Sequence, residues 1–193
     1  MKKRGSRQGN YSRCWDFINE CRWYHVFALG IFCFFFLIGF TFPIFFRAEI
    51  FNYLSNIVLE LEGRGIFGTI VFIILNNLRA SFFAVILGIL FGIFPLATSV
   101  VNGYLVGFVS RGTAETSGIW TLWRLFPHGI FEIPAVILSM GMGLKLGLDL
   151  FGKNKKQRLS HDLKEALRFF VFVILPLLLI AGIIEGVLVS LFS

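Results

Sequence analysis

Residues 26–46, with the sequence VFALGIFCFFFLIGFTFPIFF, contain no charged side chain. Residues 169–192, with the sequence FFVFVILPLLLIAGIIEGVLVSLF, contain only one, Glu185. A helix of about 20 mostly apolar residues is long enough to cross a hydrocarbon core about 30 Å thick. Each stretch therefore predicts a membrane-spanning helix, and together they decide the fold class.

The composition of the whole chain agrees with this prediction. Of its 193 residues, 56% are hydrophobic and only 15% are charged. Roughly half of a globular chain is apolar, but soluble domains do not gather their apolar residues into uninterrupted blocks long enough to span a membrane. We therefore expect a polytopic membrane protein.

Three further segments are expected to cross the membrane between these two. Pro95 and Pro127 separate them, because proline stops a helix or fits into its first turn. Residues 119–126 are too short to span, and Trp120 and Trp123 are typical of an interfacial anchor. A sixth membrane segment results if residues 119–126 dip into the bilayer. We expect an all-α, polytopic transmembrane helical bundle of about five spans, with broken or Pro-kinked helices and one short interfacial segment. The expected spans are residues 24–46, 71–94, 96–110, 128–150 and 169–191.

The formal net charge of +7 is concentrated in two places, residues 1–23 and residues 145–168. The positive-inside rule places both in the cytoplasm. We expect a plasma-membrane protein with a cytoplasmic N-terminus and an external C-terminus. Residues 1–23 should form a basic segment with an interfacial helix, and residues 24–193 a single transmembrane domain. Basic clusters of this kind bind anionic lipid headgroups, and no motif for nucleic acid accompanies the charge.

Polar residues recur at a similar depth in several of the expected spans. Glu132 lies about 6 Å below the start of the fourth span and Glu185 roughly 9 Å from the end of the fifth, at 1.5 Å per residue. Ionisable side chains inside a membrane need partners and usually mark function. Arg79, in the second span, is a suitable partner for either carboxylate. We therefore expect a buried polar cluster in the outer leaflet. Its members are Asn76, Asn77, Arg79, Asn102, His128, Glu132 and Glu185.

Three roles for this polar cluster remain open from the residues alone. It braces the helices against one another, forms a site for a ligand, an ion or a proton, or carries out catalysis. The sequence contains no His-Glu-x-x-His zinc motif and no Gly-x-Ser-x-Gly nucleophile turn. We therefore expect no catalytic residues, no metal and no cofactor.

Glycine and proline are expected to shape the helices. Gly88-x-x-x-Gly92 and Gly103-x-x-x-Gly107 are spacings that let transmembrane helices approach closely, within one chain or between two copies. Pro176 is expected to kink the last span, with neighbouring groups satisfying the freed carbonyl. The positions expected to shape the helices are Pro95, Gly103, Pro127, Gly129, Pro134 and Pro176.

A family resemblance rests on a set of motifs from about residue 66 to the end of the chain. The most specific is Pro127-His128-Gly129 followed by Glu132-x-Pro134-Ala135. The others are Asn76-Asn77, Gly88, Gly92, Asn102-Gly103, Ala181 and Glu185. In these motifs the chain resembles the stage II sporulation protein M family. The resemblance implies a five-span integral membrane protein with no established enzymatic activity. In spore-forming bacteria it implies work in a membrane complex with a peptidoglycan hydrolase.

Two functions from different classes follow. The first is a non-catalytic component that scaffolds or localises a membrane complex, with a protein partner or a second copy of the chain. The second is a channel or transporter for an ion or small polar solute, which uses the polar cluster. Water access to the cluster distinguishes them, because a brace is dry and a pathway is wet. An intramembrane enzyme is a remote third hypothesis.

Overall fold

The computed structural model describes residues 9–152 and 154–192, with the side chains of all of these except residues 124–128 and 192. The described residues form helices and turns, with no strand among them. The expected all-α fold is therefore confirmed. The helices are α1 (Asn10–Thr41), α2 (Arg47–Leu61), α3 (Ile66–Ile86), α4 (Ile93–Ser117), α5 (Phe126–Asp149), α6 (Lys155–Phe169) and α7 (Leu175–Phe192), with short 3₁₀ or π turns at Leu87–Ile89, Ile119–Leu125 and Phe170–Ile174.

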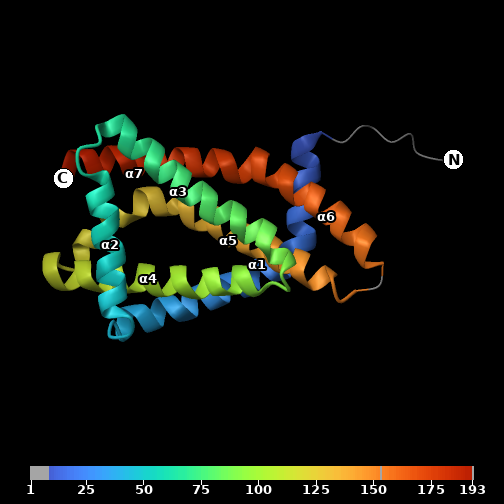
Figure 1. Cartoon of the computed structure of the whole chain (residues 1–193), viewed down its shortest axis with the longest axis horizontal. Helices are drawn as coiled ribbons and strands as arrows, with labels where there is room; N and C mark the ends of the chain where they lie inside the picture. Colours follow the sequence, from blue (N-terminus) through green and yellow to red (C-terminus); the bar gives the residue numbers. More distant parts are fainter. Residues whose placement is uncertain (1–8, 153, 193) are drawn as a thin grey trace.

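Five helical stretches are long and apolar enough to cross a membrane, as expected. They lie side by side, with α2 across one end of the bundle and α6 at the other (Figure 1). We call these the α2 end and the α6 end. The helix α1 starts at the α6 end, and α7 finishes at the α2 end. The five stretches are Asn10–Thr41, Ile66–Ile89, Ile93–Ser117, Gly129–Asp149 and Lys155–Leu191.

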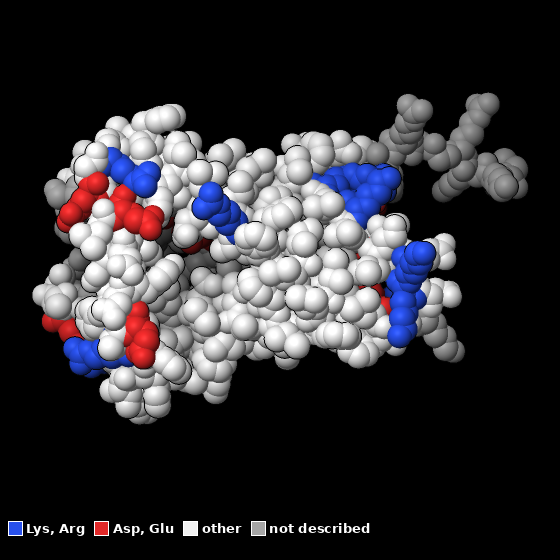
Figure 2. Space-filling model, in the orientation of Figure 1, with Lys and Arg blue, Asp and Glu red and all other residues white. Residues whose placement is uncertain are grey.

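Charged side chains gather at the two ends of the molecule. On the face shown in Figure 2, Lys, Arg, Asp and Glu cluster at the α2 end and at the α6 end, and the surface between is almost uncharged. Charged groups are costly in hydrocarbon, whereas the interfaces accommodate them. This distribution fits a bundle that spans a bilayer along its long axis.

The helices α1 and α4 pack more extensively on each other than any other pair. A Cβ atom built on Gly103 would overlap the Phe32 carbonyl oxygen, and one on Gly107 would overlap that of Phe36. On the opposite side, a Cβ on Gly39 would overlap the Tyr104 carbonyl oxygen. The backbones therefore touch, because only glycine leaves room for that approach. Gly103, one of the positions expected to shape the helices, lies at this contact.

The break between the second and third spans differs from the prediction. Pro95 lies in the first turn of α4, which begins at Ile93, and α3 ends at Ile86, before a 3₁₀ turn. The chain reverses at Phe91 and Gly92, whose φ angles are 56° and 72°. Glycine adopts this left-handed conformation easily, and proline is compatible with a first turn. Pro95 is therefore not the helix stop that we predicted.

The other prolines lie inside or next to helical turns. Pro127 lies in the first turn of α5 and Pro134 in its interior. Pro176 follows the π turn Phe170–Ile174, where the chain accommodates an irregular hydrogen-bond pattern. Gly129 is less constrained than expected, since an added Cβ would make only an ordinary 3.6 Å contact with Ile133.

Ion pairs fasten the α6 end. Glu165 of α6 binds both Arg13 of α1 and Arg168. Lys145 of α5 binds Asp162 of α6, and Asp149 forms an ion pair with Arg158 at 3.1 Å. Basic residues that we expected to face lipid headgroups are thus engaged within the protein. Several side chains of this set are buried, so the pairs hold α1, α5 and α6 together.

Candidate functional site

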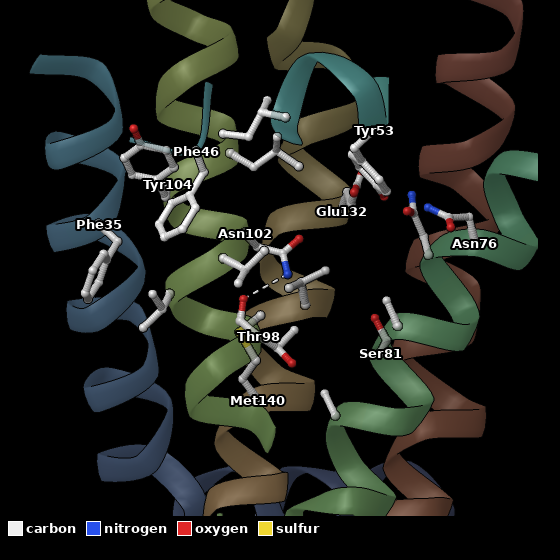
Figure 3. A pocket seen from close by; sticks show the side chains of 18 of the residues that line it. Phe35, Phe46, Tyr53, Asn76, Ser81, Thr98, Asn102, Tyr104, Glu132 and Met140 are labelled. Carbon is white, nitrogen blue, oxygen red and sulfur yellow. Dashed lines mark hydrogen bonds between the residues drawn. The ribbon is translucent and has the colours of Figure 1, made fainter. Parts of the chain in front are cut away.

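A cavity of about 820 Å³ lies among α1, α2, α3, α4 and α5, on the side of the bundle where α2 crosses. Cavities of this volume are typical of small-molecule sites. In Figure 2 a hollow opens near the α2 end, and acidic atoms are visible inside it. Figure 3 shows the lining from close by, with side chains from several helices pointing into one space.

Four of the predicted cluster residues line this cavity. They are Asn76 and Asn77 of α3, Asn102 of α4 and Glu132 of α5. Asn77 and Glu132 thus face the same cavity from two different helices. Asn102 donates to the Thr98 carbonyl oxygen of its own helix at 2.9 Å. None of the four is fully buried, because each borders the cavity or the protein surface.

The remaining predicted members are distributed differently. The carboxyl group of Glu185 lies close enough to that of Glu132 to interact with it electrostatically, but Glu185 does not line the cavity. Arg79 is exposed, does not line the cavity, and forms none of the ion pairs found among the described residues. The expected pairing of Arg79 with Glu132 or Glu185 is therefore absent from this structure. The side chain of His128 lies outside the described residues.

Ser81 is the lining residue whose polar atom is both buried and without a hydrogen-bond partner among the described atoms. It is 2% exposed, and its hydroxyl group forms no hydrogen bond with any described atom. Other hydroxyl groups in the spans, including those of Thr98, Ser99 and Ser139, bind the carbonyl oxygen four residues back. In Figure 3 the Ser81 oxygen is turned toward the cavity. A buried polar atom without a partner is costly, so this hydroxyl is suited to bind something inside the cavity.

The floor of the cavity is closed toward the α6 end. Ala84 and Met140 are its deepest lining residues on α3 and α5. Beyond them, a Cβ on Gly88 would overlap the backbone of Gly143, and one on Gly147 would overlap the backbone of Gly92. Backbone contact of this kind leaves no room for solute. The interface of α3 with α5 is therefore closed below the cavity, and the hollow in Figure 2 opens in the side of the bundle near the α2 end.

The helix α2 forms the roof, through Glu49, Ile50 and Tyr53. One side chain of α4 fixes the turn that leads into it. The Tyr104 hydroxyl accepts from the Phe45 backbone nitrogen at 3.0 Å, and it lies 3.1 Å and 2.9 Å from the carbonyl oxygens of Phe42 and Phe45. The Tyr104 hydroxyl thus fixes the turn before the roof, and Phe51 of α2 also packs edge-on against Phe108 of α4, with ring centroids 5.8 Å apart.

The sequence analysis missed Glu49, Ser81 and Tyr104. Ser81 is four residues after Asn77 and shares its helix face, which was a usable signal. Glu49 and Tyr104 carry no such signal, because they join the cavity only through the position of α2. Within the described residues, no group of three or more His, Cys, Asp or Glu side chains is arranged to hold a metal ion.

The five apolar stretches and the nearly uncharged surface between the two ends are those of a multi-pass helical membrane protein. The family model of stage II sporulation protein M matches residues 27–190, and the chain belongs to this family. The expectation from the sequence motifs is thereby confirmed.

Two relatives come from Methanocaldococcus jannaschii. Uncharacterized protein MJ0706 is 34% identical over 119 residues, which cover 58% of this chain and 51% of that protein. Uncharacterized protein MJ0793 is 30% identical over 140 residues, which cover 69% of this chain and 73% of that protein. The match thus spans about half the length of the first relative. No solved structure matches the chain.

Proposed function

We propose that this protein is a non-enzymatic membrane carrier that takes a small solute into the cavity from the membrane side on which α2 lies. One observation carries the proposal. The unpartnered Ser81 hydroxyl and the Glu132 carboxyl group border the same cavity, which lies near the α2 end and is closed between α3 and α5 toward the α6 end. Carriers hold their solute at such a site between the two ends and expose it to one side at a time.

The proposed orientation follows from the basic residues. With the α6 end in the cytoplasm, as the positive-inside rule favours, the cavity opens to the outside and the C-terminus is external. The ion pairs of Glu165, Lys145 and Asp149 then lie on the cytoplasmic side. Together with the glycine contacts below Met140, they keep that side closed in this conformation.

Scaffolding of a membrane complex is the second function that we propose to test. It is supported by family membership and by the polar side chains of Asn77 on α3 and Glu132 on α5, which face one another's helix across the cavity and are of the kind that brace spans. A scaffold needs these polar groups for its own stability and needs no solvent inside. Access of water to Ser81 therefore separates the two functions.

Ser81→Cys provides the test, in a protein whose Cys14, Cys21 and Cys33 are replaced by alanine. Ser139→Cys is a matched control, because Ser139 is also a buried serine, 0% exposed, but lies outside the cavity lining. A membrane-impermeant thiol reagent added from outside is expected to label the Ser81→Cys protein and not the Ser139→Cys protein. Absence of labelling in Ser81→Cys, in folded protein that labels fully after denaturation, would refute the carrier and favour the scaffold.

A further inference from the structure

We propose that the solute bound in this cavity is a soluble organic cation, an amine or quaternary ammonium compound with an apolar body. The inference rests on the proposed carrier function and names its ligand class. It starts from the charge of the lining. Glu132 and Glu49 are the ionisable acidic residues that border the cavity, and no Lys, Arg or His is among the described residues that line it.

A second carboxyl group, that of Glu185, adds to the negative charge near Glu132. Glu185 of α7 lies within electrostatic range of Glu132. Carboxylates within range of each other disfavour each other's charged form, and a bound cation offsets that effect. The one basic residue on this part of α3, Arg79, does not line the cavity. A cationic ligand would supply the compensating charge that the described lining residues do not.

Aromatic rings complete the chemistry of an ammonium site. Phe46 and Tyr53 lie on the roof side of the cavity and Tyr104 on its wall, and Figure 3 shows all three around the same space as Glu132. Ring faces attract ammonium groups, and aromatic cages beside carboxylates are a common means of binding quaternary ammonium ligands. The same rings have little affinity for an organic anion.

The size and lining of the cavity distinguish an organic cation from a bare metal ion. Metal cations such as Ca²⁺ require six to eight oxygen ligands around one point, whereas Glu132 and Glu49 come from different helices of a cavity of about 820 Å³. Most of the remaining lining is aliphatic or aromatic. The apolar body of the ligand would fill this part, and the Ser81 hydroxyl at the deeper end is available to one further polar group.

The first experiment compares thiosulfonate reagents of similar size and opposite charge on Ser81→Cys. The cationic reagent is expected to react faster than the anionic one, after correction for their rates with a free thiol. Glu132→Gln should reduce this rate ratio about tenfold, as expected for removal of one nearby charge at intermediate dielectric constant. Glu132→Asp should preserve it. An unchanged ratio in Glu132→Gln, or faster reaction of the anionic reagent, would overturn the inference.

The second experiment measures protection of the Ser81→Cys thiol from an uncharged maleimide. Benzyltrimethylammonium is expected to slow labelling, and a benzenesulfonate of similar size is not. Equal or better protection by the sulfonate, or no protection by any ammonium compound at tens of millimolar, refutes the cation while labelling itself still supports a carrier. Protection only by long-chain ammonium amphiphiles would identify a lipid and refute a soluble ligand. If the thiol at position 81 is not labelled at all, the carrier function and this inference both fail.

Discussion

Gly107→Ala is expected to lower the free energy of unfolding by about 2–3 kcal/mol, the upper part of the range of about 1–3 kcal/mol for overpacking a well-packed site. The added Cβ would overlap the Phe36 carbonyl oxygen and lie 2.9 Å from the Phe40 backbone nitrogen, whereas ordinary contacts begin at 3.4 Å. The nearest atoms all belong to backbone, so no side chain can rotate away. The helices α1 and α4 must move apart, and the similar contacts at Gly103 and Gly39 weaken with them.

Gly112→Ala is the matched control. Gly112 lies on the same helix, and a Cβ built there meets nothing within 4 Å. Equilibrium unfolding of the purified protein in mixed detergent micelles, followed by tryptophan fluorescence and by helicity, measures both variants against the parent chain. A difference between the two variants of less than about 0.5 kcal/mol, the usual scatter for surface substitutions, would show that α1 and α4 do not touch through their backbones.

Four further outcomes are expected. Tyr104→Phe should speed backbone hydrogen exchange in α2 and lower the free energy of unfolding by about 1–2 kcal/mol. Unchanged exchange would show that the Tyr104 hydroxyl does not hold the turn before α2. Arg79→Ala should leave the unfolding midpoint unchanged or raise it, because no ion pair is lost. A large drop in the midpoint would be evidence that Arg79 does pair with a carboxylate. Glu165→Gln should lower the free energy of unfolding by about 2–3 kcal/mol, since two arginines lose their carboxylate partner. Glu115→Gln, in an exposed ion pair, should lower it by no more than about 0.5 kcal/mol. A reporter fused to the C-terminus should be active outside the cell; cytoplasmic activity would reverse the proposed orientation.

The helices could be predicted from the sequence because membrane spans leave a strong local signal. A helix surrounded by lipid needs an apolar side chain at almost every position. A membrane span is therefore visible as a local run of apolar residues, without knowledge of the tertiary contacts. The exact ends of the helices were harder to predict from the sequence. Pro95 is compatible both with a stop and with a first turn, and the neighbouring Gly92, which adopts the positive φ, was the better guide.

The candidate site was predictable only in part, for a different reason. Asn77, Asn102 and Glu132 stand out because polar residues are rare in apolar helices, and they do meet at one cavity. The importance of Ser81 depends on a hydrogen bond that it does not form, which only the three-dimensional arrangement reveals. The role of Glu165 depends on α1 lying against α6, a contact between residues 152 positions apart.

The glycine contacts have a mechanical consequence. Helix α1 is interlocked with α4 through backbone contacts, and α7 also lies close to α3, where Cβ atoms on Gly182 and Gly186 would overlap the side chains of Ile74 and Ile70. Each pair should move as a rigid body, because its members cannot slide without colliding. The two bodies meet through α5, whose Gly143 contacts α3 below the cavity floor. A rocking motion about that contact would widen or narrow the space above it while both interlocked pairs stay intact.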